Sequence, residues 1–140
     1  MKYTYKLFMF NYFYPNFKED TMSYFENANN LYNKKEYKKA IDIYKKAIEY
    51  KENTTASLYN TAVCFIKLGD YKRAIPLLRS AILEKRDSRY YFNLGYCYSM
   101  LKDNKRALVN FNTAWALNND DNDCEKAINL IINNYKNKKF

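Results

Sequence analysis

The stretch from Tyr59 to Ile82 reads YNTAVCFIKLGDYKRAIPLLRSAI, and its pattern returns 33 residues later in the same chain. The second copy runs from Phe92 to Trp115 and reads FNLGYCYSMLKDNKRALVNFNTAW. Each copy sets small and bulky apolar residues at matching places on both sides of a short polar turn. A fixed period of this length is typical of stacked structural repeats, in which each unit buries its apolar face against its neighbours.

Alanines indicate that the repeat occurs three times. The first alanine of each copy recurs at intervals of 34 and 33 residues, as Ala40, Ala74 and Ala107. A second alanine follows seven residues after each of these, at Ala47, Ala81 and Ala114. Another small residue lies twelve residues before each of the first alanines, at Ala28, Ala62 and Gly95. Small side chains allow helices to approach one another closely. We therefore predict three repeats over residues 21–54, 55–87 and 88–119.

Each repeat is predicted to be a pair of helices. The apolar residues of the second half of repeat one have the spacing of one helical face, and they are Ala40, Ile41, Tyr44, Ala47 and Ile48. Asp70 follows the turn of repeat two and is predicted to cap the next helix, because its carboxylate can accept from free amides of the first turn. The pattern predicts an all-α solenoid of antiparallel helix pairs.

Residues 120–140 are predicted to form a capping helix and a basic tail. One apolar stripe runs through this segment at helical spacing, through Cys124, Ala127, Ile128, Ile131, Ile132 and Tyr135. Aspartates open the segment and lysines close it, which suits the helix dipole. The end of a solenoid must be covered, so we expect this helix to pack on the third repeat.

Composition argues against catalysis. The 140 residues contain no histidine and only two glycines, so the commonest general base and a glycine-rich phosphate loop are both missing. Cys64 and Cys97 occupy the same repeat position and Cys124 lies on the apolar stripe, which favours buried packing over reactivity. We predict no catalytic residue, no cofactor and no metal site, and therefore no enzymatic activity.

Cysteine usage and hydropathy indicate the compartment. The three cysteines form no Cys-x-x-Cys pair and no even-numbered framework, which favours a reducing compartment. No apolar run is long enough for a transmembrane helix, and the aromatic start of the chain lacks the small-residue cleavage site of a signal peptide. A cytoplasmic location without an integral membrane segment is expected.

The net charge of +9 comes from 24 Lys and Arg against 15 Asp and Glu. Such a surplus can attract nucleic acid or an acidic membrane. The lysines of repeat one, however, have the spacing of a solvated outer helix face, and basic residues do not interleave with aromatic ones as in RNA-binding motifs. We expect no nucleic-acid binding.

These positions resemble the tetratricopeptide repeat family. Repeat three carries the pattern in Leu94, Gly95, Tyr98, Ala107, Phe111 and Ala114; repeat two in Ala62, Phe65, Gly69, Tyr71, Ala74, Leu78 and Ala81; repeat one in Ala28, Leu31, Tyr37, Ala40, Tyr44 and Ala47. The usual closing proline is absent from all three copies, and Asn104 replaces an aromatic residue. The resemblance implies a right-handed superhelix whose first helices line a concave groove that receives a peptide or a partner helix.

The resemblance also implies which residues line this groove. They are Asn29, Tyr32, Asn33, Tyr59, Asn60, Val63, Ile66, Lys67, Arg89, Phe92, Asn93, Tyr96 and Met100. Some family members clamp a peptide carboxylate, and Asn29, Asn60 and Arg89 match that arrangement. Phe25 and Asn93 replace two of its cations, so we predict apolar and amide contacts instead, with Asn29, Asn60 and Asn93 bonding the peptide backbone. As these side chains would occupy a face that the core does not use, they predict an interaction site.

Residues 1–20 form an aromatic N-terminal segment outside the repeats. Its stretch LFMFNYFYPNF would be poorly soluble as a free tail, so we expect it to be covered. It can lie in the groove of its own chain or of a neighbour, or cap the first repeat against Tyr24 and Phe25; alternatively, the true start is Met22. The sequence thus predicts a protein-interaction scaffold, with a self-assembling structural subunit that uses residues 1–20 as the alternative.

Overall fold

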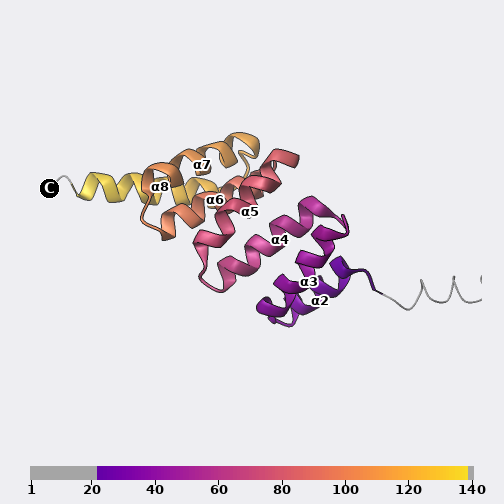
Figure 1. Cartoon of the computed structure of the whole chain (residues 1–140). Coiled ribbons are helices and arrows are strands. Elements are labelled where there is room, and N and C mark those ends of the chain that lie inside the picture. Colours follow the sequence, from indigo (N-terminus) through magenta and orange to yellow (C-terminus); the bar gives the residue numbers. More distant parts are fainter. Residues whose placement is uncertain (1–21, 139–140) are drawn as a thin grey trace, which may run out of the picture.

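The computed structural model describes residues 22–138, and every regular element in that range is an α-helix. In chain order, these helices are α2 (Tyr24–Asn33), α3 (Tyr37–Glu49), α4 (Thr54–Lys67), α5 (Tyr71–Glu84), α6 (Ser88–Met100), α7 (Asn104–Leu117) and α8 (Asn122–Asn137), and Figure 1 labels each of them. They form the pairs α2/α3, α4/α5 and α6/α7, followed by α8. The predicted all-α solenoid is confirmed.

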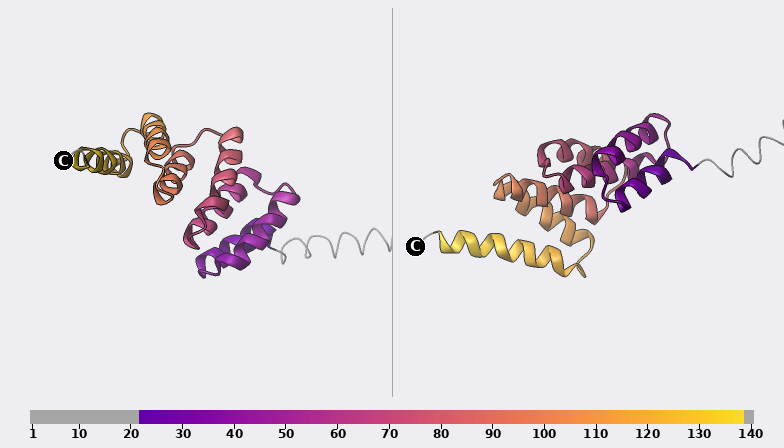
Figure 2. Two further views of the ribbon diagram at one scale, coloured as in Figure 1. Left: turned by 60° about the vertical axis from the view of Figure 1, so that its left-hand side comes forward. Right: turned by 90° about the horizontal axis from the view of Figure 1, so that it is seen from below.

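The helices stack in sequence order. Each one packs against the next from α2 to α8, and α4 also contacts α6 across the intervening helix. Figures 1 and 2 show the resulting stack, with α2 and α3 at one end and α8 at the other. Within residues 22–138, none of the helices is both long enough and apolar enough to cross a lipid bilayer.

Aspartates begin the second helices of repeats two and three. The Asp70 carboxylate accepts from the backbone N–H of Arg73 at 3.2 Å, which confirms its predicted capping role. Asp103 accepts from the N–H of Arg106 at 3.1 Å in the same way. Each carboxylate satisfies an amide that has no partner inside its helix. The turns just before these caps contain left-handed residues, with φ of 74° at Gly69 and 66° at Lys102.

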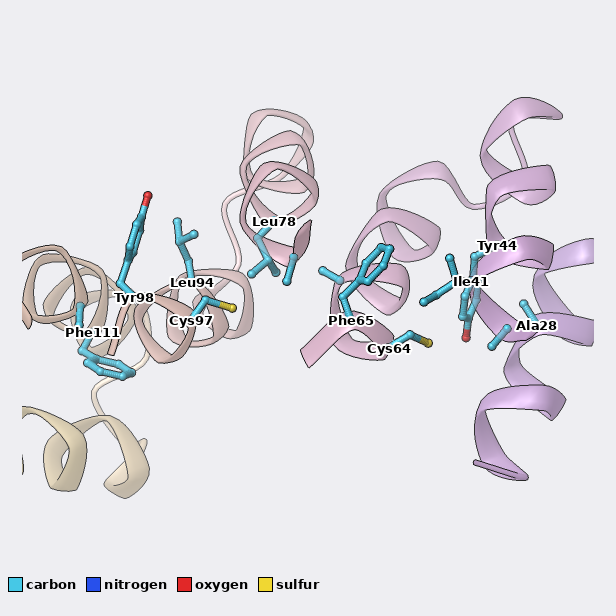
Figure 3. Close-up of a cluster of buried hydrophobic side chains, with 14 of the residues drawn as sticks. Ala28, Ile41, Tyr44, Cys64, Phe65, Leu78, Leu94, Cys97, Tyr98 and Phe111 are labelled. Atoms are coloured by element: carbon cyan, nitrogen blue, oxygen red, sulfur yellow. The ribbon is translucent and has the colours of Figure 1, made fainter. Parts of the chain in front are cut away.

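The core runs along the whole stack. Small residues are fully buried where the helices of each repeat cross, and large residues fill the space beside them (Figure 3). Tyr44, Leu78 and Phe111 occupy one position in the three repeats and are all buried. At Gly95 a side chain would not fit, since a Cβ would lie 2.8 Å from Cδ1 of Phe111. This close approach explains glycine at a position where the other repeats have alanine.

All three cysteines are free and buried, as predicted from their positions. Burial raises the pKa of the thiols of Cys64, Cys97 and Cys124 to about 12. The uncharged thiol is favoured because the thiolate would lose its hydration in the core. Thiolate is the reactive form, so these cysteines are packing residues in the folded chain.

Helix α8 covers the last repeat only with its first part. Cys124 and Ile131 are buried, and Ala127 and Ile128 pack against the core. Further along the predicted stripe, Ile132 is 37% and Tyr135 49% exposed. The last two members of the apolar stripe are therefore left uncovered by the third repeat. The reason is geometric: Figure 2 shows the end of α8 extending beyond α7, where no other helix of the described chain lies beside it.

Candidate functional site

Two adjoining hollows lie along the first helices of the three repeats. The smaller, of about 340 Å³, lies between α2 and α4 and is lined by Asn29, Tyr32, Asn33, Tyr44, Tyr59, Asn60 and Val63. The larger, of about 510 Å³, extends to α6 and is lined by Tyr32, Tyr59, Val63, Ile66, Lys67, Phe92, Asn93 and Tyr96. Tyr32, Tyr59 and Val63 line both hollows. We call this continuous surface the groove.

Eleven of the thirteen residues predicted for the site line these two hollows. The exceptions are Arg89 and Met100, which lie near the two ends of α6. Met100 is 44% exposed, while Arg89 holds its guanidinium 5.7 Å from the centre of the Tyr59 ring. Repeat spacing thus brings together residues that are more than 60 positions apart in sequence, such as Asn29 and Tyr96. Their role in binding stays a prediction.

The expectation that the core makes no use of this face is wrong. Tyr32, Tyr59, Ile66 and Phe92 are partly buried and pack against the core cluster. The ring of Phe92 lies 5.3 Å from that of Phe111, centre to centre, so one face of the groove side chain supports the interior. Bulky side chains on a closely packed surface reach the second helix of their own repeat, as Phe92 of α6 reaches Phe111 of α7, which explains this double use.

Amide side chains of the groove are held by hydrogen bonds. Asn29 Oδ1 accepts from the Tyr44 hydroxyl at 2.5 Å and from Asn60 Nδ2 at 3.2 Å. Asn93 Nδ2 donates to the Tyr59 hydroxyl at 2.9 Å. Burial raises the pKa of Tyr44 to about 12, so its hydroxyl remains a donor at neutral pH. Each amide keeps part of its hydrogen-bonding capacity, such as Nδ2 of Asn29 and Oδ1 of Asn60 and Asn93.

This network links the repeats and was not predicted from the sequence. Asn29 and Asn60 belong to different repeats, as do Tyr59 and Asn93. The recurrence of asparagine at positions 29, 60 and 93 was the available signal. Its partners, however, depend on how adjacent helices face one another, and that is set by the packing of the stack.

Arg89, the one cation that matches the carboxylate clamp, is already paired. Its Nε donates to Asp87 Oδ1 at 3.0 Å and its Nη2 contacts Asp87 Oδ2 at 2.8 Å. The hydrogen bonds from Arg89 hold the pKa of the Asp87 carboxyl below its ordinary value. With its charge compensated, Arg89 is poorly placed to receive a second carboxylate. Lys67 is the remaining cation on the lining of the groove.

The lining of the groove combines apolar and hydrogen-bonding side chains. Its side chains are aromatic, aliphatic and amide groups with one lysine, and they include no carboxylate, thiol or imidazole. Across residues 22–138, no group of three or more His, Cys, Asp or Glu lies close enough together to hold a metal ion. Aromatic rings with polar tips can contact apolar side chains and still accept or donate hydrogen bonds at their edges.

Known proteins share both the sequence pattern and this fold. The family model described as anaphase-promoting complex, cyclosome, subunit 3 matches residues 1–81, and the one described as tetratricopeptide repeat matches residues 65–122. A curated relative, anaphase-promoting complex subunit 3 of Schizosaccharomyces pombe, is 29% identical over 84 residues, which are 59% of this chain. The matched region spans only 13% of that relative's length.

Solved structures match over most of the chain. MamA from Desulfovibrio magneticus is 19% identical with a TM-score of 0.76, over 83% of this chain and 66% of that one. The first tetratricopeptide repeat domain of Spaghetti (RPAP3), bound to the HSP90 peptide SRMEEVD, is 18% identical with a TM-score of 0.76, over 81% and 90% of the two chains.

A third solved structure is YrrB, described as a tetratricopeptide repeat protein with an unusual peptide-binding site. It is 24% identical with a TM-score of 0.73, over 84% of this chain and 61% of that one. At these identities the three structures establish the fold. Together with the family models they confirm the resemblance seen in the sequence: the chain belongs to the family described as anaphase-promoting complex, cyclosome, subunit 3, and its repeats are tetratricopeptide repeats.

Proposed function

We propose that this chain is a protein-interaction scaffold that binds an extended or helical peptide segment of a partner protein in the groove. The single observation that carries the proposal is the continuity of the two hollows across all three repeats through Tyr32, Tyr59 and Val63. A surface of that length offers several neighbouring contacts to one peptide.

Apolar contact would supply most of the binding energy. Tyr59, Phe92 and Tyr96 line the larger hollow, and Tyr96 is 37% exposed beside Tyr71, with their ring centres 6.0 Å apart. Aromatic anchors that become buried in an interface contribute on the order of 2 kcal/mol or more each. We infer that the ligand presents apolar side chains to these rings.

The amides of Asn29, Asn60 and Asn93 would bind the peptide backbone through their remaining donors and acceptors. Their orientations are already set by bonds to each other or to tyrosines, so little side-chain entropy is lost when a ligand arrives. Because Arg89 is paired with Asp87, recognition of a terminal carboxylate is not part of the proposal.

Membership of a family named after a subunit of a complex supports a role inside a protein assembly. Two structural neighbours described as bound to a peptide or as carrying a peptide-binding site also support the peptide-receiving role. The alternative of self-assembly through residues 1–20 lies outside the described residues.

The test is peptide selection followed by titration. Peptides selected from a random display library against the full chain would be titrated calorimetrically against the wild type, Tyr59→Ala and Tyr96→Ala. Each variant is expected to weaken binding by about tenfold or more, since one buried aromatic anchor is lost. Tyr135→Ala is the matched control, because Tyr135 is an exposed tyrosine on α8, away from the groove.

Equal affinities for the wild type and both groove variants would refute the groove as the binding site. A loss caused by Tyr135→Ala alone would transfer the site to α8. Thermal unfolding followed by circular dichroism would show that each variant is folded, which matters for Tyr59 because it also packs against the core.

A further inference from the structure

A second pocket lies outside the groove, at the junction of α5, α6 and α7. It has a volume of about 570 Å³ and shares none of its lining residues with the groove. Three cations line it, Arg79 from α5 and Lys105 and Arg106 from α7, together with one carboxylate, Asp103. The lining therefore has a formal charge of +2.

Both guanidinium groups of the pocket lie beside the ring of Tyr98. Arg79 donates a hydrogen bond to the Tyr98 hydroxyl, and its guanidinium lies 6.0 Å from the centre of the ring. The guanidinium of Arg106 lies 5.6 Å from the same ring. The tyrosine itself is only 5% exposed, and Figure 3 shows its hydroxyl pointing away from Phe111. The Tyr98 hydroxyl thus orients Arg79, and the guanidinium of Arg106 is brought to the same ring.

Only one acidic side chain of the lining compensates these charges. Asp103 lies 3.6 Å from Nε of Arg106, and it also caps α7 by accepting from the Arg106 amide. Two like charges on one ring repel each other, and a bound anion would relieve that repulsion. Guanidinium groups match carboxylates and phosphates because they can donate two parallel hydrogen bonds.

Apolar side chains complete the pocket. Leu94 forms part of its wall, and Val109 is 61% exposed at its edge. A ligand that carries both a carboxylate and an aliphatic side chain would satisfy the cations and cover this apolar surface. We propose that the pocket is a second docking site, which binds an acidic peptide segment with an aliphatic residue next to its carboxylates.

A nucleic acid fits the pocket less well. Single-stranded nucleic acids bind through exposed aromatic rings on which bases stack, alongside a basic track for the backbone. Here the ring of Tyr98 is buried and its surroundings are occupied by guanidinium groups. An aliphatic edge at Val109 offers a contact that suits a peptide side chain.

Repeat two contains a natural control for this pocket. Arg73 occupies the position of Arg106, contacts its own capping carboxylate Asp70 at 3.4 Å, and lies 5.9 Å from the ring of Phe65. Phe65 has no hydroxyl to orient a second arginine, and the residue at the position of Arg79 one repeat earlier is Lys45. The same local ion pair therefore exists in repeat two without the paired guanidinium groups.

The experiment measures binding of a fluorescein-labelled short peptide of alternating Glu and Leu to the full chain by fluorescence anisotropy. Arg79→Ala and Arg106→Ala are each expected to weaken binding by about tenfold, since each removes a charge-assisted hydrogen-bonding group. Tyr98→Phe should weaken it severalfold by releasing Arg79. Arg73→Ala should change it less than about twofold.

Several results would overturn the proposal. These are equal binding by the wild type, Arg79→Ala and Arg106→Ala, or an equal loss caused by Arg73→Ala. Equal binding of the matched peptide with Gln in place of Glu would also do so. Competition by inorganic phosphate at the peptide's own concentration would make the pocket a small-anion site, and tighter binding of a poly-U oligonucleotide would make it a nucleic-acid site. Should Arg79→Ala fail to fold by circular dichroism, Arg79→Gln and Arg106→Ala decide the matter.

Discussion

Repeats two and three have the same skeleton but differ in how its central crossing is filled. In repeat two, Ala62 on the first helix and Leu78 on the second occupy the positions that Gly95 and Phe111 occupy in repeat three. All four residues are buried. Repeat three thus combines a larger side chain with a smaller partner. A Cβ at position 95 would lie 2.8 Å from Cδ1 of Phe111, so this exchange leaves no spare room.

The fold requires some residues in both repeats and leaves others free to change. Both repeats keep a buried cysteine, a capping aspartate and an arginine that pairs with that aspartate. These residues are Cys64, Asp70 and Arg73 in repeat two, and Cys97, Asp103 and Arg106 in repeat three. They differ at Phe65 and Tyr98, and only the tyrosine has a hydroxyl to orient a second arginine. Shared residues hold the stack together, whereas the differing residue creates a distinct surface.

The largest expected effect comes from making the crossing of repeat three resemble that of repeat two. Gly95→Ala should lower the free energy of unfolding by about 2 kcal/mol, since the new Cβ would clash with the rigid ring of Phe111. Phe111→Leu alone should cost about 1 kcal/mol through lost packing. Urea unfolding of both single variants and of the double variant measures these values.

In the double variant the two changes should compensate each other in part. The leucine would leave space for the new methyl group, so the loss should be smaller than the sum of the single losses by about 1 kcal/mol. Strict additivity would show that the Gly95–Phe111 contact does not determine the choice of glycine.

A second effect tests the buried cysteines, which the two repeats share. The pKa of Cys64 and Cys97 is about 12 in the folded chain, above the ordinary value of 9.0. The folded state therefore holds these protons more tightly than the unfolded state does. The contribution of the thiols to the free energy of unfolding should be fully present below pH 9 and should be lost as the pH rises from 9 to 12. Each thiol should contribute on the order of 1 kcal/mol to the fall by pH 10.

Chemical unfolding under reducing conditions at pH 8 and pH 10 measures this loss. Cys64→Ala and Cys97→Ala should each make the difference between the two pH values smaller, and by similar amounts because the two positions are equivalent. An unchanged difference in both variants would contradict the assigned burial of the thiols.

Capping of the second helices should give an effect of similar or smaller size. Asp70→Ala and Asp103→Ala each remove a side-chain acceptor from the first turn and should lower the free energy of unfolding by about 1 kcal/mol. Asp70→Asn and Asp103→Asn serve as matched controls, since an amide oxygen can still cap. If the asparagine variants lose as much as the alanine variants, the ion pairs to Arg73 and Arg106 matter more than the caps.

The smallest effect concerns the turns between the helices. Gly69 has a φ of 74° and Lys102, at the equivalent position of repeat three, a φ of 66°. Lys102→Gly should raise the free energy of unfolding by about 0.5 kcal/mol, because glycine adopts this conformation without strain. Thermal unfolding should show this as a slightly higher midpoint. Gly69→Ala should lower the free energy of unfolding by about 1 kcal/mol. Opposite signs are required; a loss in both variants would contradict the comparison.

Periodicity in the sequence was sufficient to predict the helix pairs, because small residues recur on those helix faces that pack against a neighbouring helix. The capping role of Asp70 and the burial of the cysteines followed from position within the repeat. Contacts between side chains on different helices could not be predicted in this way. The pairing of Arg79 with Tyr98 crosses 19 residues and depends on the angle at which α5 meets α6.

The candidate site was predicted as a set of positions, without its internal bonds. Repeat spacing placed Tyr59 and Asn93 on one surface, but their hydrogen bond requires knowledge of the rotamers. The pairing of Arg89 with Asp87 was likewise invisible, because the capping of α6 turns both side chains toward each other. The exposure of Tyr135 depends on how far α8 extends beyond α7, which no local pattern records.

Peptide binding in the groove is best tested by a nitrogen–proton correlation spectrum of the labelled full chain, recorded with and without a peptide selected against it. If the groove binds the peptide, shift changes should concentrate on α2, α4 and α6, with the side-chain amides of Asn29, Asn60 and Asn93 among the signals that move. Changes confined to α3, α5, α7 or α8 would show that the peptide binds outside the groove.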